Sequence, residues 1–389
     1  MSIFDNEIIA KVDELLHSQG EYLPLELLLA EGRLLYNDYD QWRAGNIDRL
    51  DSALFGSSDN LIEQLRSAAD YLRALNLQPH TLAYRHWGGG NPLQFSDNSL
   101  LNDLFQTAYR KSELEPQFDL FMDNTGNNLA NEVITALGDR NYAQAQALSE
   151  QLINADPLHT KIDPLLTLIE AAMDQEYTAD SSFPQQLHDK IAPLAHEHLG
   201  RSADNYLAPL WHRGAKMLAQ TPFDPRTPDS HSSLFYGKCG EWEAVIQSVE
   251  KAVEWRNQPP LLRRHAIATS KRHQANDTLL DLFRICWAFS DQIDTSVNEI
   301  GGTLRQWWRQ FLDLDSDLED QDFPAWLMIE RPAQIIGISK KQLIQLNPPS
   351  GFLTLYHLIH SEQEQLCPEY RAALKAEHPV LFAYYLHSR

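Results

Sequence analysis

Four histidines that could bind a metal ion or move protons stand close together near the middle of the chain. His188, His196 and His198 share one segment with Glu197, and His212 follows. A zinc hydrolase helix needs two histidines four residues apart with a glutamate between them, so that both rings share one face. His196 and His198 are two residues apart and fall on roughly opposite faces of a helix. We therefore expect solvated or capping histidines, and no metal ion or cofactor, unless residues from elsewhere complete a site.

A pair of carboxylates offers acid/base chemistry. Asp119 and Asp123 could share one face of a helix, which is a geometry that general acid/base catalysis uses. Many helices carry such a pair without chemistry. A hydrolase assembled from this pair together with His196 and His198 therefore stands only as an alternative function.

An acidic run covers residues 313–322. Its first aspartates stand at alternate positions, as at the start of a calcium-binding loop. The sixth position, however, is Leu318 instead of glycine, and the twelfth is Pro324 instead of glutamate. We expect an acidic loop without an ion, which could dock a basic partner. The carboxylates are Asp313, Asp315, Asp317, Glu319, Asp320 and Asp322.

A basic patch covers residues 256–272, which contain no acidic side chain. In an acidic protein this is the best local candidate for contacting phosphate or an acidic partner, and it supports a second alternative, a nucleic-acid-associated regulator. Ile267 interrupts the basic face, so we prefer pairing with acidic residues elsewhere in the chain. The patch consists of Arg256, Arg263, Arg264, Lys271 and Arg272.

Two aromatic clusters are the predicted anchors for a protein partner. Tyr, Trp and Arg are enriched at interaction hot spots, because large rigid side chains give contact area at low entropic cost. For the first cluster, packing is the other role that we consider. The predicted anchors are Tyr36, Tyr39, Trp42 and Arg43 in the first cluster, and Trp307, Trp308 and Arg309 in the second.

The cysteines are few and far apart. Cys239, Cys286 and Cys367 form no Cys-x-x-Cys pair. They predict neither a disulfide framework nor a zinc site, and we expect small buried hydrophobic residues.

The composition of the whole chain narrows the classes of function. The 389 residues include 32 Lys+Arg against 54 Asp+Glu, a net charge of −22, which makes nucleic acid an unlikely partner. The hydrophobic fraction of 43% indicates a folded protein. The first residues lack the pattern of a secretory signal, and the chain contains no run of about 18 apolar residues. We expect a cytoplasmic protein that does not enter a membrane.

Helical periodicity dominates the elements that must position these residues. One face of an expected helix repeats Leu61, Leu65 and Leu72 after a plausible cap at Asn60, and Pro24 suits the first position of another helix. Strand signals are scarce, so the pattern predicts a nearly all-α fold. Glycine and proline clusters divide the chain into expected helical blocks at 1–112, 113–220 and 221–389.

Residues 128–157 read as two short helices joined by a tight turn. The segment resembles a tetratricopeptide repeat: Tyr142, Ala145 and Pro157 match that family's spacing of an aromatic, a small residue and a proline, although the first helix lacks its Trp and its Leu-Gly pair. A weaker echo covers residues 234–256. The resemblance implies helical hairpins stacked as a solenoid or as an irregular bundle, with a surface that binds another protein. The expected function is therefore a non-catalytic protein-binding scaffold or adaptor.

Overall fold

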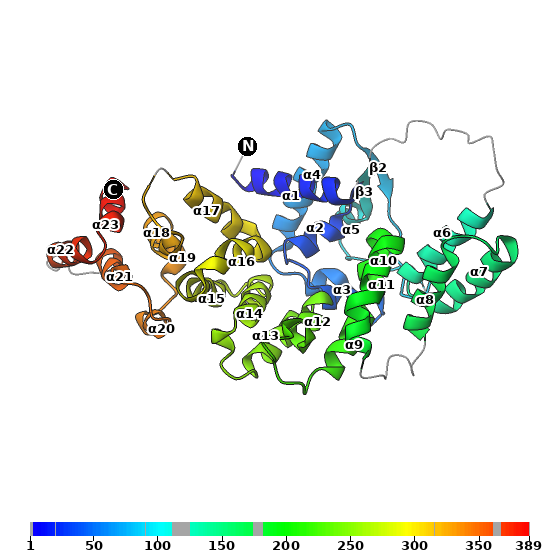
Figure 1. The fold of residues 1–389 in the computed structure, drawn as a ribbon. Helices are drawn as coiled ribbons and strands as arrows, with labels where there is room; N and C mark the ends of the chain where they lie inside the picture. Colours follow the sequence, from blue (N-terminus) through cyan, green and yellow to red (C-terminus); the bar gives the residue numbers. More distant parts are fainter. Residues whose placement is uncertain are drawn as a thin grey trace. The chain divides into compact units, whose positions relative to one another are not determined.

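The structure is a computed structural model that describes residues 3–19, 21–89, 91–110, 125–173, 182–314, 316–360 and 367–388. Helices make up most of these residues and one small sheet accompanies them, which confirms the predicted all-α class (Figure 1). The chain divides into two compact units. Unit 1 comprises residues 1–221 and 229–241, and unit 2 comprises residues 222–228 and 242–389. The expected blocks 1–112 and 113–220 thus fall within one unit.

Among the described residues, unit 1 contains helices α1 to α12 and the three strands of the sheet. The strands are β1 (Glu21–Tyr22), β2 (Gln78–Thr81) and β3 (Thr107–Arg110). The helices are α1 (Ile3–Gln19), α2 (Pro24–Ala30), α3 (Tyr36–Arg43), α4 (Ser58–Ala74), α5 (Ser99–Gln106), α6 (Thr125–Gly138), α7 (Tyr142–Ala155), α8 (Ile162–Met173), α9 (Phe183–Gln186), α10 (Ala192–Leu199), α11 (Ala203–Met217) and α12 (Ser232–Lys238).

The small sheet has the order β1-β3-β2, and both pairings are antiparallel. Tyr22 of β1 lies opposite Tyr109 of β3, and both rings are buried. The apolar faces of α1 and α4 cover these rings, with Val12 and Leu72 fully buried among them. Burial of these faces removes apolar surface from water, which is the main favourable contribution to folding here.

Local sequence signals place two of the helix starts. Pro24 opens α2, as expected from its missing N–H. The start of α4 corrects the expected cap: the N-cap is Ser57, whose hydroxyl accepts from the Asn60 N–H at 3.3 Å. Asn60 therefore lies inside the first turn of α4, and the true cap stands three residues before it.

The segment that resembles a tetratricopeptide repeat forms a helical hairpin of α6 and α7. Ala145 is fully buried, and its small side chain lets the two helices approach closely. The turn between the helices contains Arg140 in the left-handed conformation, with φ +56. The Asn141 N–H bonds to the carbonyl of Ala136 and the Arg140 N–H to that of Leu137, a Schellman motif that ends α6.

The weaker echo at residues 234–256 does not have this arrangement. Its first half is α12, which packs against α11 in unit 1. Its second half begins α13 (Trp242–Glu250), which packs against α14 (Pro259–Lys271) in unit 2. The two halves thus pair with different helices.

Unit 2 holds the remaining helices around an aromatic core. Trp287 packs edge-on against Phe352, and Trp308 packs edge-on against Phe323. After α13 and α14 the helices are α15 (Ala275–Ala288), α16 (Ile293–Ile300), α17 (Gly302–Leu312), α18 (Phe323–Glu330), α19 (Pro332–Ile335), α20 (Lys340–Gln345), α21 (Phe352–His360), α22 (Cys367–Glu377) and α23 (Pro379–His387). Among the helices of the described residues, none has the length and apolar character needed to cross a membrane.

Candidate functional site

The first aromatic cluster lies mostly inside unit 1. Trp42 is fully buried, and Tyr39 and Arg43 are nearly so. The Trp42 indole N–H donates to the Gln94 carbonyl at 3.1 Å. Tyr36 is half-buried. These contacts correspond to the packing role that we considered for the cluster, and the buried side chains offer little surface to a partner.

The cluster joins α3 to the turn of the α6–α7 hairpin through Trp87. The guanidinium carbons of Arg43 and Arg140 lie 3.8 Å and 4.2 Å from the Trp87 ring centroid. The Trp87 indole N–H donates to Asp40 Oδ1 at 3.1 Å, and Arg140 Nη1 lies 2.6 Å from the same oxygen. Cation–π and charged hydrogen bonds of this kind are stronger where water is excluded. No sequence pattern points to this junction, because its members come from three separate segments.

The second aromatic cluster lies on α17. Trp308 is buried, and its indole N–H donates to Asp294 Oδ1 at 3.1 Å. Trp307 is half-buried and Arg309 is exposed. Arg309 is therefore the member of this cluster most open to a partner.

The acidic run is partly built into unit 2. Asp322 is buried and lies 3.0 Å from His378 Nε2, and it also accepts from the Glu319 N–H at 3.0 Å. Asp315 lies outside the described residues. The run is therefore not a wholly solvated loop. Its last carboxylate, that of Asp322, contacts His378, which is the N-cap residue of α23.

Two of the five members of the basic patch, Arg263 and Arg272, lie beside glutamates of unit 2. Arg256 is exposed, and its guanidinium carbon lies 4.2 Å from the Trp255 ring centroid. Lys271 is half-buried at the end of α14. The other contacts are Arg263 Nε to Glu299 Oε2 at 2.9 Å, Arg272 Nε to Glu243 Oε2 at 3.7 Å, and Arg264 Nη1 donating to the Pro228 carbonyl at 2.9 Å.

All four histidines lie beside a carboxylate: His212 pairs with Glu241, and the other three pair with residues near them in sequence. The pairs are His188 with Asp189 at 2.8 Å, His196 with Asp204 at 3.9 Å, and His198 with Glu197 at 3.9 Å. Asp119 and Asp123, the other members of the alternative hydrolase site, lie outside the described residues.

His212 differs from the other three histidines because a cysteine sulfur as well as a carboxylate lies close to its ring. Its Nδ1 is hydrogen-bonded to Glu241 Oε1, and the Cys239 sulfur lies close to both. Cys239 is buried, and its thiol donates to the Tyr236 carbonyl at 3.4 Å. Burial raises the pKa of this thiol well above its ordinary value, and the Glu241 carboxylate adds to the rise.

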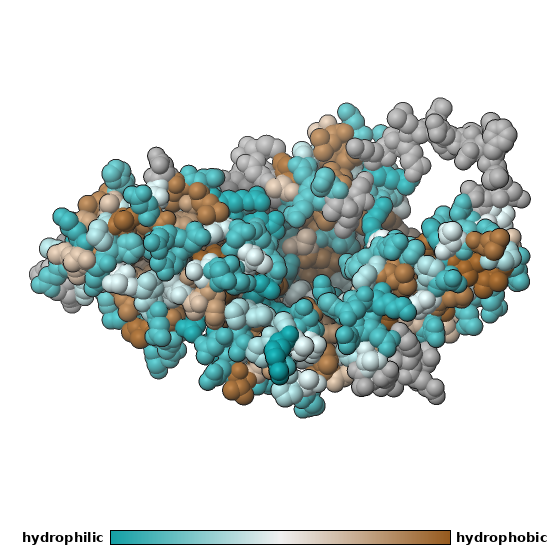
Figure 2. All heavy atoms as spheres, viewed as in Figure 1, coloured by the Kyte–Doolittle hydropathy of each residue, from teal (hydrophilic) through white to brown (hydrophobic). Residues whose placement is uncertain are grey.

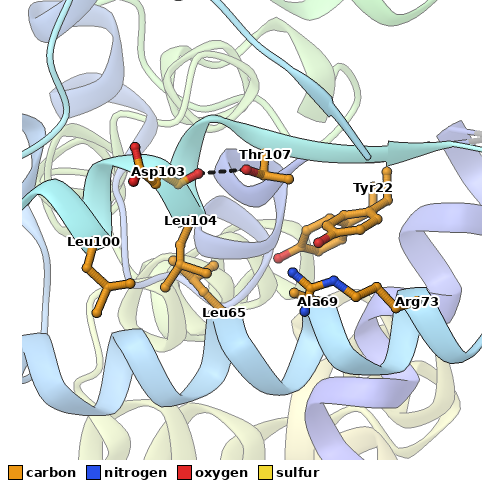
Figure 3. Close-up of a pocket in the computed structure, with 9 residues that line it drawn as sticks. Tyr22, Leu65, Ala69, Arg73, Leu100, Asp103, Leu104 and Thr107 are labelled. Atoms are coloured by element: carbon orange, nitrogen blue, oxygen red, sulfur yellow. Dashed lines mark hydrogen bonds between the residues drawn. The ribbon is translucent and has the colours of Figure 1, made fainter. Parts of the chain in front are cut away.

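A small cavity lies between α4, α5 and the sheet (Figure 3). Its volume is about 180 Å³, which suits a molecule little larger than benzene. Leu65 and Leu104 line one end, and the Arg73 side chain and the Tyr22 ring line the other (Figure 3). The Tyr22 hydroxyl is buried without a hydrogen-bond partner in the described residues. Burial, with the nearby Glu31 carboxylate, raises the pKa of this hydroxyl.

The surface of α6–α8 combines exposed apolar and acidic side chains. Leu158, in the connection from α7 to α8, is 92% exposed, and Ile153 near the end of α7 is 36% exposed. Figure 2 shows hydrophobic residues among hydrophilic ones over this part of unit 1. Exposed carboxylates on the same three helices are Glu132, Glu150, Asp163 and Glu170. Together with these carboxylates, the exposed apolar side chains of Leu158 and Ile153 make this surface a candidate contact surface.

Comparisons with protein-family models, with curated proteins and with solved structures find no match to this chain. The function therefore has to be argued from the residues alone.

Proposed function

We propose that the chain is a non-catalytic, cytoplasmic scaffold or adaptor whose α6–α8 surface binds a protein segment that carries basic and apolar side chains. The observation that carries this proposal is the exposure of Ile153 on the α6–α7 hairpin and of Leu158 in the connection that follows it. The resemblance of this hairpin to a tetratricopeptide repeat supports it, since such hairpins commonly present surfaces for partner binding.

The charge of this surface specifies the chemistry of the partner. Residues 125–173 contain six acidic side chains and two basic ones, which leaves four negative charges in excess. One of the basic residues, Arg140, is held inside unit 1 by Asp40, so Lys161 is the basic side chain left to the surface. Exposed carboxylates around an apolar contact favour a basic segment, because complementary charges accelerate association and select the partner.

Affinity purification with a matched pair of variants tests the proposal. Leu158→Asp removes the exposed apolar side chain and adds a negative charge to the surface. Burial of a leucine at an interface contributes about 1.5–3 kcal/mol, so a partner that contacts Leu158 should bind about tenfold or more weakly to the variant. Val253→Asp is the control, because Val253 is a similarly exposed apolar residue (88%) in unit 2.

Proteins captured from the native cell by the wild-type chain and by Val253→Asp, but lost with Leu158→Asp, would support the proposal. Recovery should also fall as the salt concentration rises, because the basic partner is attracted by charge. Equal recovery with both variants, with helical content unchanged by circular dichroism, would refute the assignment of this surface. Fluorescence microscopy of the tagged chain checks the cytoplasmic location.

A further inference from the structure

We propose that His212, Cys239 and Glu241 form a binding site for a single zinc ion, or for a similar divalent transition metal, in unit 1. The three side chains offer an imidazole nitrogen, a thiolate sulfur and a carboxylate oxygen, which are the three ligand types that zinc takes in proteins. The proposal does not depend on the partner-binding surface of α6–α8, because it uses different residues.

The ligand atoms are already gathered. His212 Nδ1, Cys239 Sγ and a carboxylate oxygen of Glu241 all lie within 4.8 Å of one another. In a tetrahedral zinc site with bond lengths of about 2.0–2.3 Å, the ligand atoms stand about 3.3–3.8 Å apart. Movements of about 1 Å or less, within the reach of side-chain rotations, would therefore complete the coordination.

Two packed elements bring these ligands together. His212 lies on α11, and Cys239 and Glu241 lie at the end of α12, which packs directly on α11. The end of α12 is a Schellman motif: the Glu241 N–H bonds to the Tyr236 carbonyl at 2.9 Å and the Gly240 N–H to the Gly237 carbonyl at 3.2 Å. This turn holds the thiol and the carboxylate, two residues apart, on the same side of the chain as His212.

Gly240 is required for that turn. Its φ is +72, a conformation that other residues rarely adopt, and a Cβ built on it would lie 2.4 Å from the Tyr36 Cβ. Both constraints exclude a side chain at this position. The close approach of α3 and the left-handed turn together fix the position of Cys239 and Glu241.

The site is open to an ion from solvent. The side chains of His212 and Glu241 are 35% and 22% exposed, whereas Cys239 is buried behind them. Three protein ligands with one accessible side leave a fourth position for water or for a group of another molecule.

Metal titration of the full-length chain, freed of any purification tag and of metal by chelation, tests the proposal. Zn²⁺ should bind at one ion per chain, measured by calorimetry and by native mass spectrometry. Co²⁺ used as a spectroscopic probe should give a thiolate-to-cobalt charge-transfer band and the intense visible absorption of a tetrahedral site. The charge-transfer band specifically reports the Cys239 sulfur.

Three variants separate this site from adventitious binding. Cys239→Ser should abolish the charge-transfer band, and Glu241→Gln, which keeps the size of the side chain, should weaken Zn²⁺ binding at least tenfold. His188→Gln is the control, because His188 is paired with Asp189 in the same unit without a cysteine. It should leave Zn²⁺ affinity unchanged.

Two results would overturn the proposal. The first is a folded wild-type chain that binds no Zn²⁺ at micromolar concentrations. The second is Zn²⁺ binding that survives both Cys239→Ser and Glu241→Gln with unchanged affinity. If Cys239→Ser does not fold, the cobalt spectrum of the wild-type chain and the Glu241→Gln titration still decide the question.

Discussion

Substitution of Arg140 by alanine should detach the α6–α7 hairpin from the N-terminal part of unit 1. Arg140 is the residue of the hairpin turn that reaches across to α3 and Trp87. Its Nη1 lies 2.6 Å from Asp40 Oδ1, its Nε donates to the Asn205 carbonyl at 2.7 Å, and its guanidinium carbon lies 4.2 Å from the Trp87 ring centroid. All three contacts end with Arg140→Ala.

The magnitude follows from the burial of these groups. Removing one partner of a fully buried ion pair costs about 3–5 kcal/mol. The Asp40 side chain is 29% exposed and keeps the hydrogen bond from Trp87, so water and the indole N–H compensate part of that loss. The cation–π contact adds about 0.5–2 kcal/mol. We expect Arg140→Ala to lower the free energy of unfolding of unit 1 by about 2–4 kcal/mol in total.

Arg73→Ala is a matched control in the same unit. Arg73 also pairs with a carboxylate, Asp70, at 2.9 Å, and also lies over an aromatic ring, that of Tyr109, at 5.9 Å. Its side chain is 59% exposed, whereas that of Arg140 is 10% exposed. Exposed pairs contribute about 0–1 kcal/mol, so Arg73→Ala should change stability little.

Hydrogen exchange followed peptide by peptide in native conditions is the appropriate assay, because it measures opening of unit 1 separately from unit 2. Peptides of α6, α7 and α3 should lose protection with Arg140→Ala and keep it with Arg73→Ala. Equal and small losses with both variants would refute the reasoning, since burial would then make no difference to these contacts.

Three further predictions concern single residues. Gly240→Ala should lower the thermal unfolding temperature of the chain more than Gly88→Ala does. Both glycines have a positive φ, so both substitutions strain the backbone. A Cβ at position 240 also collides with Tyr36, whereas a Cβ at position 88 meets nothing within 4 Å. Burial lowers the pKa of His357 below its ordinary value of 6.5, so the unfolded chain binds a proton first as the pH falls. The free energy of unfolding in urea should therefore fall as the pH drops through 6.5, and His357→Gln should reduce this dependence. Cys286 is fully buried and burial raises the pKa of its thiol, so peptide mapping after alkylation should find it modified only in denaturant.

The helices could be predicted from the sequence because their signals are local. Leu61, Leu65 and Leu72 recur at helical spacing and all three are buried on α4. Pro24 marks a helix start for a reason that involves only its own backbone. The strands gave no comparable signal, since they are two to four residues long and their pairing joins segments far apart in the chain. Alternation over so short a length does not differ from chance.

The candidate sites were harder to predict because they depend on which segments meet. Tyr39 and Trp42 have the residue types of a contact surface, and the sequence does not show that Trp87 packs against Tyr39 or that Tyr84 packs against Trp42. His212 follows the other histidines in sequence and lies on α11. Its neighbours Cys239 and Glu241 lie at the end of α12, a separate helix that begins fifteen residues after the last residue of α11. Spacing rules for metal sites work within one helix or loop, so a site shared by two helices escapes them.

One backbone motif underlies both the hairpin junction and the proposed metal site. The Schellman turns after α6 and after α12 place Arg140 and Gly240 at the same left-handed position. After α6 the position is open toward Trp87, so the contacts of the Arg140 guanidinium offset the strain of its left-handed backbone. After α12 the position faces the Tyr36 Cβ, so no side chain can stand there and the flanking residues meet His212 instead. The turn after α6 thus joins parts of unit 1, and the turn after α12 positions the proposed metal ligands. The residues that pack against each turn, Trp87 and Tyr36, decide which of these roles it has.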